Sequence, residues 1–115
     1  MPKFMKVERI LRAAEFGEVK ERGVRARAGT ISVAAVPRES GIPRLGLVVS
    51  SAVGNSPQRN RLKRVIREFF RMNKGAFLPG DFVVIPRQGA AALENEEIRI
   101  QLRRAFEALG EKLKR

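Results

Sequence analysis

The sequence predicts a small α+β protein in which helices cover one mixed sheet of three or four strands. Amphipathic stretches of helical period alternate with short apolar runs in the order α-β-β-α-β-α. Glycine and proline mark most of the boundaries between these stretches. The length of 115 residues allows one modest hydrophobic core. We therefore expect a single domain over residues 1–115, with residues 1–6 flexible.

The first third of the chain predicts a helix followed by a strand. Residues 7–22 carry apolar side chains at helical spacing, and Gly23 follows at the position where glycine ends many helices. Residues 24–36 then alternate in hydrophobicity, as a half-buried strand does. We expect one strand here, with Gly29 marking a bulge or a close approach of another backbone.

The rest of the chain predicts two more strands and two more helices. Residues 37–43 hold Ser-Gly between two prolines, which predicts a turn, and residues 45–49 form an apolar run typical of a strand covered on both faces. Residues 50–55 link that strand to a basic helix. A third strand is predicted over 82–85. The last helix, over 96–114, has its acids early and its bases late, which suits the helix dipole.

Residues 54–71 predict the basic helix around which the chain is organised. Ser56 is a helix-capping residue type, and Pro57 suits the first helical position. At about 100° per residue, apolar side chains gather on one side: Leu62, Val65, Ile66, Phe69 and Phe70. Cations follow a four-residue ladder on the opposite side: Arg59, Lys63, Arg67 and Arg71, with Asn60 and Arg64 beside them. One face is therefore core, and the other is a cationic ridge.

The one-sided charge of this helix favours a polyanionic partner. Glu68 is the only acid in its basic run, and like charges four residues apart repel by a few tenths of a kcal/mol. The net charge of +12 favours nucleic acid or an anionic membrane surface as the partner class. A solvated surface helix is the alternative interpretation. Because the chain has no cysteine, no signal-peptide pattern and no apolar run near the roughly 18 residues that span a bilayer, we expect a soluble cytoplasmic protein.

The centre of the basic helix resembles a known family signature. Its residues are Arg59, Asn60 and Arg61, then Leu62, Lys63, Arg64 and Arg67, preceded by Gly54 and Asn55. This run resembles the signature of the bacterial ribonuclease P protein subunit, and residues 9–23, 44–50 and 80–87 resemble its flanking elements. The resemblance implies a ribosomal-protein-like α-β-β-α-β-α sandwich. It also implies a left-handed crossover around the signature helix, where a right-handed one would be the general rule.

The resemblance implies two partners, a ribonuclease P RNA and precursor tRNA, and assigns the ridge to the first. Position by position, the signature places these residues in contact with the catalytic RNA: Arg59, Asn60, Arg61, Lys63, Arg64 and Arg67. Arg71 joins them on geometry alone. Arg61 projects nearer the apolar flank, so it has two interpretations: an RNA contact, or a pin that holds the helix through an ion pair or a carbonyl.

The resemblance also implies a cleft between the first helix and the sheet that holds the 5′ leader of precursor tRNA. Phe16 matches one of the family's stacking positions, with ordinary core packing as its alternative role. Two other positions that often hold aromatic side chains are Lys20 and Ala34 here, and the chain has no Tyr or Trp. We expect the leader grip to rely less on stacking and more on charge, from Arg12, Lys20, Arg25 and Arg27. Simple solvation is the alternative for the strand cations.

The sequence predicts no catalytic residue and no metal site in the protein itself. It has no His and no Cys, and its single aspartate, Asp81, follows Gly80 where a strand begins. The resemblance implies that the RNA subunit hydrolyses the phosphodiester with Mg²⁺, so we expect neither a cofactor of the protein's own nor a small-molecule substrate. A structural RNA-binding protein of ribosomal type is the main alternative. DNA binding lacks a helix-turn-helix partner, and membrane binding is disfavoured because strands can cover the helix's apolar face.

Overall fold

The computed structural model describes residues 13–114 except residues 40, 74, 76 and 78. The described helices are α2 (Ala13–Arg22), α3 (Ser56–Met72) and α4 (Asn95–Leu113), with a short 3₁₀ helix, η2 (Ala90–Ala92). The strands are β1 (Val24–Ala28), β2 (Ile31–Pro37), β3 (Arg44–Leu47) and β4 (Gly80–Pro86). The expected flexible residues 1–6, and residues 7–12 of the expected first helix, lie outside the described part of the chain.

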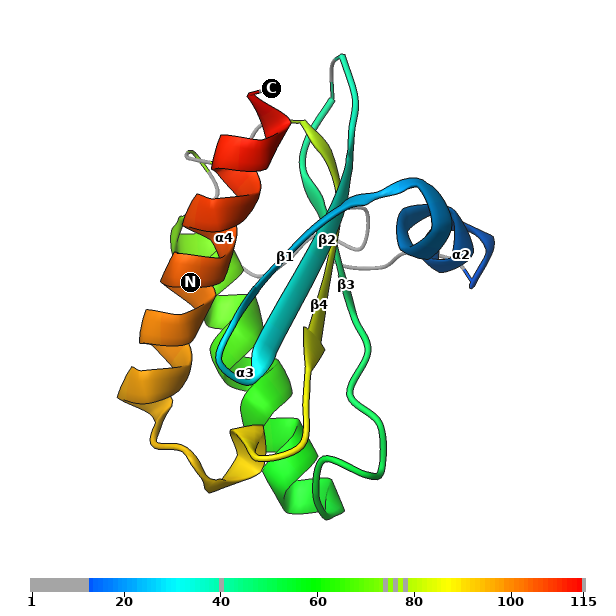
Figure 1. Ribbon diagram of the computed structural model, residues 1–115. Coiled ribbons are helices and arrows are strands. Elements are labelled where there is room, and N and C mark those ends of the chain that lie inside the picture. The colour runs from blue at the N-terminus through cyan, green and yellow to red at the C-terminus, as the bar shows by residue number, and fades with distance from the viewer. Residues whose placement is uncertain (1–12, 40, 74, 76, 78, 115) are drawn as a thin grey trace.

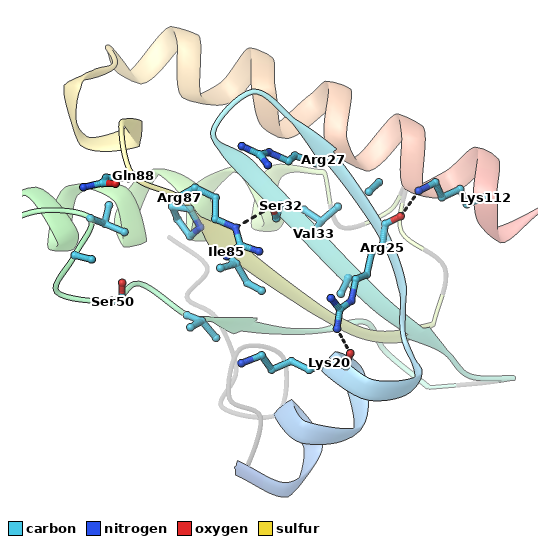
Figure 2. A pocket seen from close by; sticks show the side chains of 16 residues that line it. Lys20, Arg25, Arg27, Ser32, Val33, Ser50, Ile85, Arg87, Gln88 and Lys112 are labelled. Carbon is cyan, nitrogen blue, oxygen red and sulfur yellow. Dashed lines mark hydrogen bonds between the residues drawn. The ribbon is translucent and has the colours of Figure 1, made fainter.

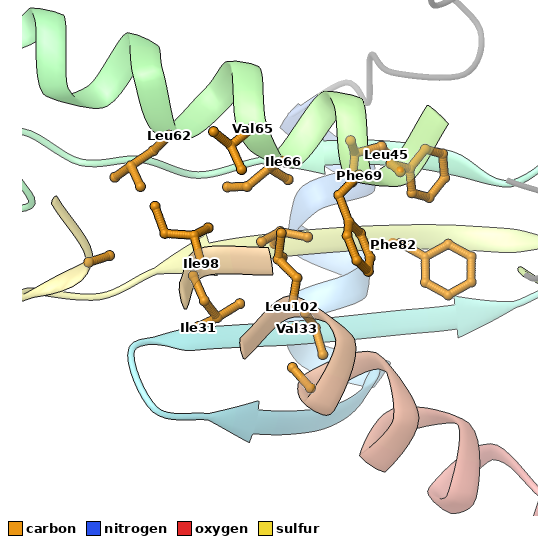
Figure 3. Close-up of a cluster of buried hydrophobic side chains, with 14 of the residues drawn as sticks. Ile31, Val33, Leu45, Leu62, Val65, Ile66, Phe69, Phe82, Ile98 and Leu102 are labelled. Atoms are coloured by element: carbon orange, nitrogen blue, oxygen red, sulfur yellow. The ribbon is translucent and has the colours of Figure 1, made fainter. Parts of the chain in front are cut away.

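The four strands form one mixed sheet in the order β1-β2-β4-β3. β1 pairs with β2 and β2 with β4 in antiparallel fashion, whereas β3 and β4 are parallel. Parallel neighbours need a crossover connection, and α3 supplies it. Viewed from the α3 side with both strands pointing upward, β4 lies to the left of β3, so the crossover is left-handed (Figure 3). The fold class and this unusual hand agree with what the family resemblance implies.

The single strand expected over residues 24–36 is wrong, because the chain folds there into a hairpin. β1 and β2 meet at a two-residue turn, and Gly29 adopts φ 58° at its first position. Glycine at this place is typical of the tight hairpin turns that match the twist of the strands. The side chain of Gln101 on α4 fixes the turn by accepting hydrogen bonds from the amide and the hydroxyl of Thr30, at 2.9 and 2.8 Å. The apolar positions shift from Ala26 and Ala28 to Ile31 and Val33 at the turn, a change of phase that a bulge within one strand would also produce.

The helices cover the two faces of the sheet unequally. α3 and α4 lie together on one face and α2 crosses the other (Figure 1). The main core lies under α3 and α4, where Leu62 and Ile66 meet Ile98, Leu102 and the sheet (Figure 3). A smaller cluster under α2 joins Val19 to Ala34 and Val83. The second face is therefore only partly covered, which leaves room beside α2.

The N-terminus of α3 is held by a residue other than the one expected. Asn55, not Ser56, caps the helix: its Oδ1 accepts from the amide of Gln58 at 2.9 Å, and Gln58 Oε1 accepts from the amide of Asn55 at 2.8 Å. This reciprocal capping box requires Gln or Glu three residues after the cap, and only Asn55 has one. Pro57 accordingly occupies the second helical position. The expected apolar face is confirmed, because all five of its residues are buried.

Asp81 holds three segments together at the start of β4. Its side chain is 0% exposed, and both of its oxygens accept from the guanidinium of Arg44 at 2.8 Å. Arg38, just after β2, also binds Asp81 and lies 3.6 Å from Glu18 on α2. Burial alone would raise the pKa of Asp81, but the hydrogen bonds from Arg44 and Arg38 outweigh it, so the pKa lies below its ordinary value. Asp81 is a structural anchor and does more than start a strand.

Candidate nucleic-acid interface

The cationic ridge of α3 lies on the flank of the helix that points away from α4. The buried side chains face the sheet, and Arg61 marks the flank that faces η2 and α4. At about 100° per residue, Lys63 and Arg67 therefore project to the opposite flank. Asn60 and Arg64 are exposed. The other members of the ridge are half-buried: Arg59, Lys63, Arg67 and Arg71.

Local contacts hold the first ridge cation in place. Arg59 Nε donates to the carbonyl of Gly54 at 3.2 Å, and its Nη2 donates to Ser56 Oγ at 3.1 Å. The guanidinium therefore lies along the first turn of α3 and remains half-exposed. The whole ridge is carried by one helix of 17 residues whose start is capped and whose apolar face is packed. Such a helix presents its cations in a fixed row, at a spacing that suits a phosphate backbone.

Arg61 belongs to the signature but not to the ridge. Its Nη1 donates to Asn95 Oδ1 at 2.6 Å, and its Nη2 donates to the carbonyl of Ala91 at 2.9 Å. Both bonds bridge from α3 to the segment that begins α4. Of the two interpretations drawn from the sequence, the carbonyl-bound pin is the one for which the structure provides contacts.

A cleft lies on the opposite face of the sheet, between α2, β1 and the end of β4. It encloses about 600 Å³. Five cations line it: Lys20, Arg25, Arg27, Arg87 and Lys112 (Figure 2). Its floor is apolar and includes Ala34, Val48 and Ile85. A groove with basic walls and an apolar floor suits a flexible polyanion that also carries planar, weakly polar groups.

Backbone carbonyls orient the cleft cations. Arg25 donates to the carbonyl of Lys20, joining β1 to the last turn of α2 (Figure 2). Arg27 Nε donates to the carbonyl of Gly29 at 2.9 Å. Lys112 Nζ reaches from α4 to the carbonyl of Arg25 at 2.5 Å. Arg87 Nε donates to Ser32 Oγ at 3.2 Å. These side chains are therefore held along the walls of the cleft.

The structure brings together three of the five predicted leader-binding residues. Lys20, Arg25 and Arg27 all line the cleft. Arg12 lies outside the described residues, and so does the side chain of Phe16, although its backbone belongs to α2. Ala34 forms part of the cleft floor and packs against Val19.

Sequence reasoning missed Arg87, Gln88 and Lys112 as cleft residues. Arg87 and Gln88 follow directly after the last apolar strand, a position where polar side chains often line a site at a sheet edge, so they offered a usable signal. Lys112 offered none, because it lies 87 residues from its partner Arg25 along the chain. Only the packing of α4 beside β1 places it there.

The ridge and the cleft meet along the segment between β3 and α3. Val48, Ser50, Ala52 and Val53 border the cleft, and the same segment leads into the cap of α3 at Asn55. The two cationic surfaces are thus separate but adjacent. One long RNA, or two RNAs side by side, can reach both surfaces from this edge of the sheet.

Two other kinds of feature, a metal-ligand cluster and a membrane-spanning helix, are absent from the described part of the chain. Among residues 13–114 with their four gaps, no three His, Cys, Asp or Glu side chains gather as metal ligands would. No described helix is long and apolar enough to cross a membrane.

Comparison with known proteins decides the family. The ribonuclease P family model matches residues 4–110 of this sequence. The chain belongs to the ribonuclease P protein family. A ribonuclease P protein component from Citrifermentans bemidjiense is 37% identical over 109 residues, covering 95% of this chain and 94% of the relative. One from Desulforapulum autotrophicum is 34% identical, covering 92% of each.

Solved structures of ribonuclease P proteins share the fold. The Staphylococcus aureus protein matches with a TM-score of 0.82 at 32% identity, over 87% of this chain and 93% of that one. The Thermotoga maritima protein matches with a TM-score of 0.73 at 32% identity, over 83% and 91%. Membership of the ribonuclease P protein family implies an RNA partner and a role within an endoribonuclease complex. Among the described residues, the cationic ridge and the cleft are two surfaces rich in Lys and Arg.

Proposed function

We propose that this chain is the protein subunit of ribonuclease P and assists the magnesium-dependent 5′ maturation of precursor tRNA. In this proposal the ridge on α3 binds the catalytic RNA, and the cleft beside α2 binds the 5′ leader. The observation that carries the proposal is the presence of two distinct cationic surfaces on one rigid fold. A protein that holds a single RNA needs one such surface, whereas a protein that joins a ribozyme to its substrate needs two.

Electrostatics support the assignment of the ridge. A row of Lys and Arg on one helix flank replaces condensed counterions along a phosphate backbone, which gives strong, salt-dependent affinity with little base specificity. The capping box and the packed apolar face fix the row before binding, so little ordering cost remains. A structured RNA with fixed phosphate positions suits such a surface. In this assignment Arg59, Lys63, Arg64 and Arg67 are phosphate contacts, with Asn60 and Arg71 beside them.

The shape of the cleft supports its assignment to a single strand. Its walls carry Lys20, Arg25, Arg27 and Arg87, while its floor is apolar. Basic walls track a backbone and an apolar floor receives bases without reading them, so the leader would bind with little sequence preference. Because the chain has no Tyr or Trp, charge would contribute more than stacking here.

The net charge explains how the protein would assist a reaction that it does not catalyse. A ribozyme and a precursor tRNA are both polyanions, and their approach is unfavourable unless cations lie between them. A protein with net charge +12 lowers that repulsion and therefore lowers the Mg²⁺ concentration that the RNA needs. The hydrolysis, in this proposal, belongs to the RNA and its bound Mg²⁺ ions.

Reconstitution tests the proposal. The purified protein alone should leave precursor tRNA uncut, and it should restore cleavage by a bacterial ribonuclease P RNA at low Mg²⁺, where that RNA alone is slow. High Mg²⁺ without protein serves as the control for an active RNA. Absence of stimulation at low Mg²⁺ would reject the assignment, and cleavage by the protein alone would reject the division of labour.

A further inference from the structure

The wall of the cleft at the end of β4 continues directly into η2. Arg87 and Gln88 line the cleft, and the chain then turns at Gly89, where φ is 100°, into η2. Two hydrogen bonds make this corner firm. The amide of Arg87 donates to the carbonyl of Thr30 at 2.7 Å, and the amide of Ala90 donates to the carbonyl of Arg87 at 3.1 Å. The wall is therefore tied to the β1–β2 turn through the amide of Arg87 and to η2 through the carbonyl of Arg87.

α3 holds η2 in place from two points. Arg61 binds the carbonyl of Ala91 with one arm of its guanidinium and Asn95 Oδ1 with the other, at 2.9 and 2.6 Å. Gly54, just before the cap of α3, packs so closely that a Cβ there would lie 3.2 Å from Ala91 Cβ. The planar guanidinium of Arg61 donates two hydrogen bonds, so it fixes the orientation of η2 as well as its distance from α3. A lysine ammonium at the same position would not fix the orientation.

These contacts connect the two cationic surfaces through one side chain. The ridge is fixed to α3, and the Arg87–Gln88 wall is joined to η2 by the bond from the Ala90 amide to the Arg87 carbonyl. Arg61 joins α3 to η2. We infer that Arg61 is a positioning residue: it holds the Arg87–Gln88 wall of the cleft in register with the ridge, and it does not contact RNA. The inference rests on the proposed role of the cleft in leader binding.

The contacts of Arg61 separate its role from that of its neighbours. Arg64, three residues later, is exposed, whereas Arg61 is half-buried and its guanidinium binds Ala91 and Asn95. To reach a phosphate, the guanidinium of Arg61 would have to leave both Asn95 and the Ala91 carbonyl. That exchange would release η2 from α3 and would leave the Ala91 carbonyl and Asn95 Oδ1 without these donors.

Variants of Asn95 test the inference without touching the ridge. We would compare wild type, Asn95→Ala, Arg61→Lys and Arg61→Ala as holoenzymes assembled with ribonuclease P RNA. Two quantities are measured: the ratio of affinities for precursor tRNA with a leader and for mature tRNA, and the salt slope of binding to ribonuclease P RNA. Thermal unfolding of each free protein checks that it is folded at the assay temperature.

A positioning role predicts a distinctive pattern. Asn95→Ala and Arg61→Lys should each lower the leader-to-mature affinity ratio by about 3- to 10-fold, with an unchanged salt slope. Combining Asn95→Ala with Arg61→Ala should lower the ratio no further than Arg61→Ala alone, because the two residues act through one contact. Arg64→Ala provides the matched control, with a salt slope smaller by about one and an unchanged ratio.

Other outcomes would overturn the inference. If Arg61→Ala reduced the salt slope by about one while Asn95→Ala left the affinity ratio unchanged, Arg61 would be a phosphate contact. If Arg61→Ala failed to fold, the result for Asn95→Ala would test the inference by itself, because that variant removes one side-chain hydrogen bond and no charge. An unchanged affinity ratio in Asn95→Ala would refute the inference. A wild-type holoenzyme that did not distinguish precursor from mature tRNA would instead refute the proposed role of the cleft.

Discussion

The ridge and the cleft differ in how the chain builds them. The ridge is a single stretch of 17 residues, so every member stands at a spacing fixed by helix geometry. The cleft draws on α2, β1, β2, the segment after β3, the end of β4 with the two residues that follow it, and the last turn of α4. Local sequence therefore determines the ridge, whereas only the complete tertiary fold determines the cleft.

This difference has a physical consequence for function. The capping box and the buried face of α3 are formed by residues other than the ridge cations, so removing the cations should weaken RNA binding far more than it weakens the fold. Cleft cations hold backbone carbonyls, as Arg25 does at Lys20 and Lys112 does at Arg25. Changes in the cleft should therefore alter its shape as well as its charge. The predictions below test that contrast, from the largest expected effect to the smallest.

Removing the ridge charge should have the largest effect. Arg59, Lys63 and Arg67 changed together to Ala should weaken binding to ribonuclease P RNA by about 100-fold and reduce the salt slope by up to about three. The free energy of unfolding should change little, because like-charge repulsion on α3 is relieved. Filter binding over a range of salt concentrations, with denaturant unfolding in parallel, measures both quantities.

A matched triple variant on α4 provides the control for the ridge. Arg99, Arg103 and Arg104 changed to Ala remove the same net charge from a helix that also carries the nearby acids Glu96 and Glu107. We expect a salt slope within about one unit of the wild-type value. Equal losses for the two triples would mean that net charge, not the ridge, drives binding.

Asp81→Asn should lower stability without affecting the ridge. Removing one partner of a buried ion pair leaves the charge of the other partner uncompensated. Because the side chain of Arg38 is 45% exposed, water compensates part of its charge. We therefore expect a loss of about 2 kcal/mol in the free energy of unfolding. The salt slope of RNA binding should stay the same. A changed slope would mean that the Asp81 network reaches the RNA interface.

The pH dependence of this loss has a defined sign. The folded-state pKa of Asp81 lies below its ordinary value, so its ionised form adds stability at neutral pH that is lost as the pH falls below about 4. Wild type and Asp81→Asn should therefore differ most above pH 4 and converge in more acidic solution. Denaturant unfolding at several pH values measures this convergence, and a constant gap down to pH 2 would contradict it.

Removing charge from the cleft should affect only substrates that carry a leader. Lys20 and Arg25 changed together to Ala should weaken binding of precursor tRNA by about 10-fold and leave mature tRNA unaffected. Arg103 and Arg104 changed to Ala remove the same charge far from the cleft and serve as the control. Equal weakening for precursor and mature tRNA would place Lys20 and Arg25 outside the leader site.

Phe16→Ala should have a smaller effect of the same kind. Stacking of one base on an aromatic ring contributes about 1–3 kcal/mol of binding free energy. A contribution at the low end of that range means that losing the Phe16 ring should reduce affinity for precursor tRNA roughly fivefold. Mature tRNA should bind as before. A loss of stability accompanied by equal weakening for both RNAs would instead assign Phe16 to the core.

The sequence predicted the parts of this molecule that depend on local periodicity. The α+β class, the apolar face of α3 and the positions of β3 and β4 followed from patterns within single segments. The hairpin at Gly29 was not predicted because the change of phase at its two-residue turn also fits a bulge within one strand. The cap lies at Asn55, not Ser56, because only Asn55 has a capping-box partner, Gln58. The left-handed crossover came from family resemblance, since general physical preference favours the opposite hand.

Long-range contacts account for what the sequence could not predict. Nothing near Lys112 indicates that it reaches the carbonyl of Arg25, and nothing near Asp81 indicates that Arg38 and Arg44 converge on it. Arg61 could be assigned to neither of its two roles until Ala91 and Asn95 were placed beside it. In each case the partner lies at least 30 residues away along the chain.

Site-specific cross-linking tests the two-surface account most directly. The chain contains no cysteine, so Arg64→Cys on the ridge, Gln88→Cys in the cleft and Arg104→Cys on α4 each provide one unique attachment point for a photo-cross-linker. In the assembled complex, the probe at 64 should label ribonuclease P RNA, the probe at 88 should label the leader of precursor tRNA, and the probe at 104 should label neither efficiently. Labelling of the same RNA region from 64 and 88 would contradict the account.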